Sequence, residues 1–169
     1  EIIPKEKMKK LQSPRSQTIK LGQLGKFLKG SGISRADLAQ DGLPCLRYGE
    51  IYSTYGNTVS ELRARVAKGS AAHALELVSG DIVFAASGET AKEIGKAVAY
   101  IGAETAYVGG DTIVLRNHGQ DPVFLVHLLN SDGVVRQKSR LGKGQSVVHI
   151  HAPDLAEVKL QLPPLPEQR

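Results

Sequence analysis

The residues best suited to chemistry are the cations and amides of RQKSRLGKG, residues 136–144. Arg and Lys neutralise phosphates, whereas Arg and Gln can also pair with the edges of guanine and adenine. We therefore predict a nucleic-acid-binding loop, in which Gln137 or Arg140 reads a base and the lysines hold phosphates. The predicted contacts of this loop are Arg136, Gln137, Lys138, Ser139, Arg140 and Lys143.

Two further polar stretches, LKGSGISR (28–35) and RYGEIYSTYG (47–56), carry the same residue types more sparsely. Glu50 could accept a hydrogen bond from cytosine N4, and the tyrosines could pack along a nucleic-acid backbone. A structural role for Tyr48 and Glu50 in the core is an equally good explanation. Any one of the polar stretches, taken alone, is equally well explained as a solvated loop. Their joint occurrence favours nucleic acid. The candidates are Lys29, Ser31, Arg35, Arg47, Tyr48, Glu50, Tyr52 and Tyr55, with Glu89 and Lys92 on a neighbouring SGET loop.

Other chemistries fit the sequence less well. Gly88 and Gly95-Lys96 are too far apart for a phosphate-binding loop, and Ala97 stands where Ser or Thr should hold magnesium. His127, His149 and His151 have no cysteine partner and no HxxxH spacing, so we expect no metal site. Cys45 follows a proline in an apolar run, which favours core burial over nucleophilic catalysis. We expect no cofactor and no catalytic residue, and a metal-dependent nucleic-acid enzyme remains a remote alternative.

The bulk composition is that of an ordinary globular chain. Its 169 residues are 41% hydrophobic and 23% charged, which is enough for the core of one domain. The net charge of +5 favours a polyanionic partner. A single cysteine, the absence of an apolar run of about 18 residues and the absence of a signal-peptide core are typical of a cytoplasmic protein.

The elements that must position these residues are read from hydrophobic periodicity. Apolar runs rich in β-branched residues predict buried strands at 81–88, 96–102 and 111–117. Pro122 and the spacing of the next residues predict a helix over 123–131. The end of the chain is predicted as a strand SVVHIH, a turn of helix over 153–157 and a last strand VKLQL.

The remaining segments are predicted from weaker patterns. Leu21, Leu24, Phe27 and Leu28 give a helical stripe, and residues 59–81 show helical spacing in two stretches. Ser34 and Asp37 predict a short capped helix, and residues 43–56 alternate like a strand or a strand pair. Strands and helices interleave irregularly, so we predict one compact α+β domain with a mixed, twisted β-sheet and several short helices.

The order of these motifs carries more information than any one of them. It runs PCLRYGEIYSTYG, GDIVFAASGETAKEIGKAVAYIG, YVGGDTIVLR, FLVHLLNS and QKSRLGKGQSVVHIHAPDLAEVKLQLPPLPEQR. This ordered set, from about Ile19 to Arg169, strongly resembles a target recognition domain of the DNA specificity subunit of type I restriction–modification systems, which act in phage defence.

The resemblance implies a domain that is not itself catalytic. It would dock on double-stranded DNA and read one half of a bipartite target, while methyltransferase subunits flip and methylate an adenine and a restriction–translocase subunit completes the complex. It also implies a division into a basic arm or linker (1–18), the recognition domain (19–162) and a stiff proline-rich joint (163–169) that leads into a spacer helix beginning near the Glu-Gln.

The sequence also leaves open how the domain is used. The family's subunits usually carry two recognition domains, and this chain resembles one; it also begins with Glu, so we expect a fragment or a processed form. Alternatives are the recognition module of a fused restriction–methyltransferase and a half-size subunit that acts as a homodimer. Recognition residues vary within the family, so no base reader is carried over by position.

Overall fold

The computed structural model describes residues 15–169. Most of the predicted basic arm, residues 1–14, lies outside the described residues. Gln17 and Thr18, which were assigned to the arm, belong instead to strand β1 (Gln17–Lys20), which pairs antiparallel with β13 (Lys159–Leu162). The two ends of the described chain are therefore joined by main-chain hydrogen bonds.

A five-stranded sheet forms the centre of the molecule. Its order is β2 (Lys26–Lys29), β11 (Thr112–Arg116), β7 (Ile82–Ala85), β9 (Ala97–Tyr100) and β4 (Thr58–Val59). All neighbours are antiparallel except β4 and β9, which are parallel. Every residue of β7 and β9 is buried, because both faces of the sheet are covered. That burial explains why these strands are continuous apolar runs.

The two faces of this sheet carry separate hydrophobic clusters. Ile82 and Phe84 face a cluster that includes residues of α4 (Pro122–Leu129), α5 (Asp132–Leu141) and α6 (Ala152–Ala156). Val83 and Ala85 face a cluster that includes Ile51 of α2 (Tyr48–Ser53). Adjacent strand residues point to opposite faces, so α5 and α2 lie on opposite sides of the central sheet.

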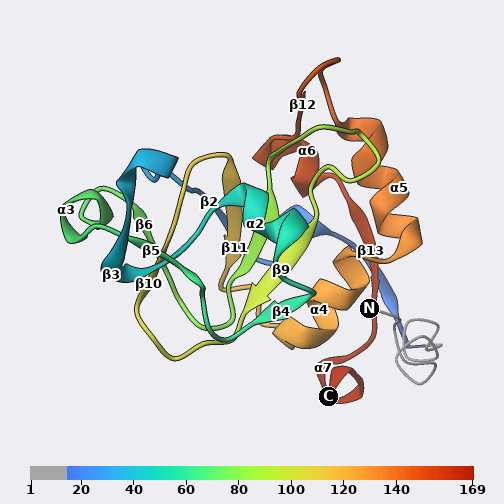
Figure 1. Ribbon diagram of the computed structural model, residues 1–169. Coiled ribbons are helices and arrows are strands. Elements are labelled where there is room, and N and C mark those ends of the chain that lie inside the picture. The colour runs from blue at the N-terminus through green and yellow to red at the C-terminus, as the bar shows by residue number, and fades with distance from the viewer. Residues whose placement is uncertain (1–14) are drawn as a thin grey trace.

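A smaller four-stranded sheet covers the α2 side. Its order is β5 (Ala64–Val66), β3 (Leu38–Leu46), β10 (Ala106–Val108) and β6 (Leu75–Leu77), with only β3 and β10 parallel. With α3 (Lys68–Ala71) it forms a lobe on one side of the molecule, while α5 and α6 lie on the other side (Figure 1). The predicted α+β class with mixed, twisted sheets is confirmed.

The strands and the helix predicted from strong patterns are confirmed. The apolar runs are β7, β9 and β11, and the carboxylate of Asp121 caps α4 by accepting a hydrogen bond of 2.8 Å from the Phe124 amide. The end of the chain also follows the prediction, with β12 (Val148–His149), α6 and β13 in order. β12 pairs with β8 (Ser87–Gly88).

Several weaker predictions are wrong. Residues 19–30 form no α-helix; they form the end of β1, the single 3₁₀ turn η1 (Leu21–Gln23) and β2. Residues 59–81 form β4, β5, α3 and β6. The strand predicted over 43–56 ends at Leu46, and α2 follows it. The helix predicted at Ser34 is the single turn η2 (Arg35–Asp37), whose predicted cap is present: the Ser34 amide donates to Asp37 over 2.7 Å.

The prediction of a DNA-binding loop over 136–144 is also wrong in its conformation, because most of this stretch belongs to α5. Val134, Lys138 and Leu141 follow one another at helical spacing, and this stripe faces the core. Only Gly142, Lys143 and Gly144 lie beyond the helix. The structure thus places all of these predicted contacts except Lys143 on a helix instead of a loop.

Candidate nucleic-acid interface

The predicted contact residues fall into separate groups. The first group is Lys29, Ser31 and Arg35. Ser31 and Arg35 lie near the lobe, whereas Lys29 lines a pocket with His151 and Ala152 on the α6 side of the central sheet. Arg47 and the tyrosines belong to α2 and its flanks. The third group lies on α5, on the opposite side of the central sheet (Figure 1). The structure therefore does not bring all the predicted residues onto one surface.

The first group is exposed at the end of β2 and in the turn that follows. Lys29 and Arg35 are exposed, and within residues 15–169 neither forms an ion pair. The Ser31 hydroxyl donates to the His73 carbonyl over 3.2 Å. Hydrogen bonds from Ser34 and Ser70 lower the pKa of Asp37. These bonds occupy the carboxylate next to Arg35, so the guanidinium is available to a partner.

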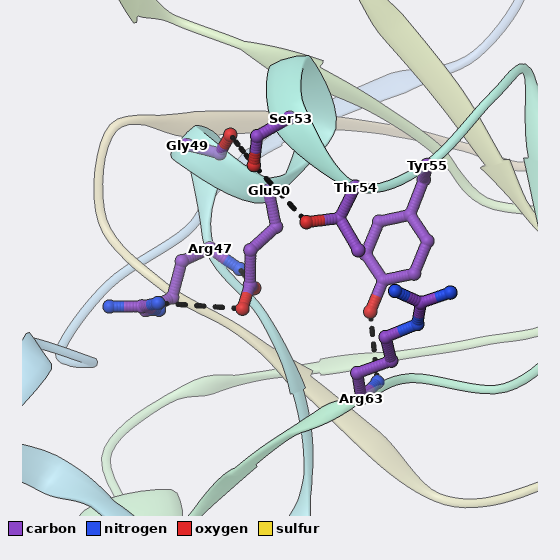
Figure 2. Close-up of polar contacts among 7 residues, drawn as sticks. All are labelled: Arg47, Gly49, Glu50, Ser53, Thr54, Tyr55 and Arg63. Carbon is purple, nitrogen blue, oxygen red and sulfur yellow. Dashed lines mark hydrogen bonds and ion pairs between the residues drawn. The ribbon is translucent and has the colours of Figure 1, made fainter.

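The Glu50 carboxylate caps the start of helix α2. The Arg47 amide donates to Glu50 Oε2 over 3.0 Å, and Arg47 Nη2 lies 3.4 Å from Glu50 Oε1. Figure 2 shows the Glu50 side chain pointing back towards Arg47. Because the carboxylate is only 15% exposed, its contacts are those of a helix cap rather than of a base reader. Nε of Arg47 is buried and has no hydrogen-bond partner within the described chain.

The tyrosines of this group differ in exposure. The Tyr52 hydroxyl donates to the Ser87 carbonyl over 2.9 Å, and burial raises its pKa well above the usual value. A Cβ at Gly88 would lie 2.7 Å from that hydroxyl, so only glycine allows the close approach. Tyr55 accepts a hydrogen bond of 2.9 Å from the Arg63 amide. Tyr52 and Tyr55 therefore brace the fold, whereas Tyr48 is 37% exposed and can reach a partner.

Glu89 and Lys92 are both exposed on the segment that follows β8. Glu93 and Lys96 lie further along the same segment, and Lys96 Nζ is 3.5 Å from the Tyr55 carbonyl. The Tyr52–Ser87 hydrogen bond ties this segment to α2. Lys92 also lines a depression with Val135 and Lys138 of α5, so this segment lies between α2 and α5.

The α5 group is only partly available. Arg136 and Arg140 are exposed, and Lys143 forms an ion pair of 3.2 Å with Asp154. The Gln137 side chain is already hydrogen-bonded to β13. Its Nε2 donates to the Lys159 carbonyl over 2.9 Å, and its Oε1 accepts from the Lys159 backbone amide over 2.8 Å. Ser139 is half-buried. Gln137 therefore stabilises the packing of α5 in this structure.

Lys138 cannot act as the predicted phosphate anchor in this structure. It is 1% exposed, and its Nζ donates to the Gly95 carbonyl over 2.6 Å. The prediction assumed that the Lys138 side chain is exposed at the surface. In the structure, the aliphatic part of this side chain fills a core position. Burial lowers the pKa of this amine to about 7.

Other candidate chemistries lack a site in the described chain. Within residues 15–169, no three His, Cys, Asp or Glu side chains are placed to hold a metal ion. His149 Nδ1 lies 2.8 Å from the Ser87 hydroxyl, and His151 precedes α6. Cys45 is fully buried, as predicted, and burial raises the pKa of its thiol to about 11. No helix among these residues has the length and apolar character needed to cross a membrane.

Sequence reasoning missed one polar surface of the lobe. Arg63 and Arg65 flank an open depression together with Gln40 of β3. Both arginines are exposed and alternate with Leu62, Ala64 and Val66, which face the interior. This period of two is a strand signal, but the helical interpretation of residues 59–81 concealed it.

Comparisons with known proteins give a consistent fold. Neither the protein-family models nor the curated proteins contain a match to this chain. Among solved structures, the type I restriction–modification S subunit from M. genitalium has a TM-score of 0.58 and 14% identity over 87% of this chain and 34% of its own. The HsdS subunit from Thermoanaerobacter tengcongensis has a TM-score of 0.62 and 16% identity over 97% and 39%.

A third structure, determined to explain complex assembly and conformational transition of the type I restriction–modification system, has a TM-score of 0.62 and 18% identity over 92% of this chain and 36% of its own. The chain thus spans between a third and two fifths of the chains it matches. The motif order and the fold agree: over nearly all of its length, this chain has the fold of one part of a type I restriction–modification S subunit.

Proposed function

We propose that this chain recognises a specific double-stranded DNA sequence for a type I restriction–modification complex and reads one half of a bipartite target. The observation that carries the proposal is the fold shared with S subunits over 87% and 97% of the chain. In this proposal the domain is not catalytic and works in the cytoplasm. Methyltransferase subunits supply adenine methylation, and a restriction–translocase subunit supplies cleavage.

The charge of the chain supports a DNA partner. A net charge of +5 attracts the phosphate backbone, and contacts to phosphates fix the position from which base edges are read. We propose that the contacts come from the predicted residues whose side chains reach the surface. These are Lys29, Ser31, Arg35, Tyr48, Glu89, Lys92, Arg136, Arg140 and Lys143.

A single straight duplex would meet only one side of the central sheet. The lobe with α2 and the α5 surface are therefore competing docking faces (Figure 1). Each face offers an exposed arginine suited to a matched test, Arg35 on the lobe and Arg140 on α5. The two alanine variants lose the same charge, so any difference between them reports on the position of the DNA.

The experiment expresses the complete subunit that carries this chain together with its methyltransferase subunit and maps adenine methylation by long-read sequencing. We expect a bipartite motif. We also expect one of the two variants to weaken binding to all sequences and to reduce the salt dependence of binding by about one phosphate contact per residue. An assembled complex that methylates no specific motif would contradict the proposal.

A further inference from the structure

The lobe carries a polar depression on the ribbon formed by the two strands at one edge of its four-stranded sheet. Strands β3 and β5 pair antiparallel there, with an irregular register between Leu38 and Leu43. The depression is lined by Leu38, Ala39, Gln40, Arg63 and Arg65, and is open to solvent. β5 is the edge strand of the small sheet, so the ribbon has no neighbour on that side.

The charge of the depression is unbalanced. Neither Asp nor Glu lines it, and within residues 15–169 neither Arg63 nor Arg65 forms an ion pair. The carboxylate of Asp37, which precedes β3, already accepts hydrogen bonds from the Ser34 amide and the Ser70 hydroxyl. Two guanidinium groups and one amide therefore face solvent without an anionic partner from the described chain.

The arginines are nevertheless held in position. Arg65 Nη1 donates to the Gly42 carbonyl over 3.2 Å, which leaves its other donors available. The backbone amide of Arg63 donates a hydrogen bond to the Tyr55 hydroxyl, and Figure 2 shows the Arg63 side chain lying beside the Tyr55 ring. Tyr55 thus fixes the main chain at Arg63. The guanidinium of Arg65, which is held by Gly42, loses less conformational entropy on binding than a free one.

The residue types match the groups exposed on base edges. Arg can pair with O6 and N7 of guanine through two hydrogen bonds, Gln can pair with N6 and N7 of adenine, and Ala contacts the thymine methyl group. The major groove of B-DNA admits a two-stranded β-ribbon. The shape of the ribbon and the residue types of the depression thus fit base edges better than phosphates alone, because binding a phosphate requires only positive charge.

We propose that Gln40, Arg63 and Arg65 form a base-reading surface that enters the major groove of double-stranded DNA. This inference rests on the proposed function and names the side chains that determine specificity. It places the DNA on the side of the lobe and α2, where Arg35 is an exposed cation available as a phosphate contact.

The test uses the complete subunit in its methyltransferase complex. One variant is Arg63→Lys with Arg65→Lys, which keeps the charge but removes the paired donors of guanidinium. A second variant is Gln40→Ala. The control is Lys26→Ala with Lys159→Ala, because both lysines are exposed and lie outside all the predicted contacts. Methylation mapping then reports the motif of each complex.

We expect each reading variant to lose preference at one or more base pairs of one half-site, by about 5- to 150-fold per lost contact, while the other half-site stays unchanged. The control should keep the wild-type motif. Unchanged motifs in both reading variants would overturn this inference and leave the proposed function standing. A wild-type complex without any motif would overturn both.

A second measurement does not depend on variants. Arginine modification of the wild-type complex, followed by mass spectrometry, reports the accessibility of Arg63 and Arg65 with and without DNA of the mapped target sequence. We expect the target DNA to reduce modification of both arginines at least fivefold. Equal modification with and without the DNA would overturn the inference.

Discussion

The Nζ atom of Lys138 lies 2.6 Å from the carbonyl oxygen of Gly95 and about 5.9 Å from the centre of the Phe84 ring. The amine is buried, and within residues 15–169 no carboxylate pairs with it. Gly95 has a φ of +72°, a backbone conformation that suits glycine and turns its carbonyl group within reach of α5. This contact joins α5 to the start of β9.

The pH dependence of stability should report this contact. Burial lowers the pKa of Lys138 in the folded chain to about 7, while the unfolded chain keeps an ordinary lysine. Between about pH 7 and pH 10 the unfolded state therefore binds more protons, and the free energy of unfolding rises with pH by up to about 1.4 kcal/mol per unit. Urea unfolding at pH 7 and pH 9 measures the slope.

Lys138→Met should flatten this slope and stabilise the fold at pH 7, because methionine fills a similar volume without a charge. Lys26→Met is the matched control at an exposed lysine and should leave the slope unchanged. An identical slope in Lys138→Met and the wild type would show that another group titrates in this range.

The cap of α2 gives a second prediction. Glu50→Ala removes the acceptor of the Arg47 amide and leaves the half-buried guanidinium without its carboxylate, so stability should fall by about 1 kcal/mol. Glu50→Gln keeps an acceptor and should lose less. Thermal unfolding measures both. If Glu50→Ala changed the methylation motif without changing stability, Glu50 would be a base reader after all.

The sequence predicted elements whose signal is local. β7, β9 and β11 are buried apolar runs, and α4 combines a capping aspartate with a proline in its first turn. Each of these patterns follows from the element's own residues, because both faces of the strands are covered. Distant partners are not needed to recognise them.

The sequence could not predict elements whose identity depends on distant partners. β4, β5 and β6 have two or three residues each, too few for a periodic pattern, and are strands because they pair with β9, β3 and β10. β2 pairs with β11, more than 80 positions away in the chain, and that pairing overrides its helical stripe. The surface formed by Gln40, Arg63 and Arg65 depends on the same pairing.

The pair formed by Asp81 and Arg116 gives a third prediction. Arg116 donates to both carboxylate oxygens of Asp81, over 2.9 and 2.7 Å, and the Val78 amide donates to one of them over 2.8 Å. Asp81 is 2% exposed, and the hydrogen bonds that Arg116 donates to its carboxylate raise the pKa of Arg116. Asp81→Asn should cost about 3–5 kcal/mol, because it leaves a partly buried cation unpaired.

Chemical denaturation of the purified chain measures this loss. Asp111→Asn is the matched control: Asp111 is exposed, and its φ of +54° is one that asparagine tolerates. The control should change stability by less than about 0.5 kcal/mol. Equal midpoints for the two variants would mean that the Asp81–Arg116 pair contributes nothing beyond an exposed aspartate.

The last turn of the chain gives a fourth prediction, on the segment expected from sequence to be a stiff proline-rich joint. Gln168 of α7 (Leu165–Gln168) is 2% exposed and makes three hydrogen bonds. Its Oε1 accepts from the Asp121 amide over 3.0 Å, and its Nε2 donates to Gln120 Oε1 over 2.6 Å and to the Pro163 carbonyl over 3.0 Å. Gln168 thus ties α7 to the start of α4.

Gln168→Ala should release α7 from α4 and cost about 1–3 kcal/mol, since it leaves the buried groups that it bonds without partners. Amide hydrogen exchange should quicken at Leu165, Glu167 and Asp121, while the central strands keep their protection. Gln145→Ala, at an exposed glutamine, is the control and should leave exchange unchanged. If α7 exchanged at the same rate in both variants, Pro163, Pro164 and Pro166 alone would hold the turn, and the side-chain bridge of Gln168 would not fix the position of α7.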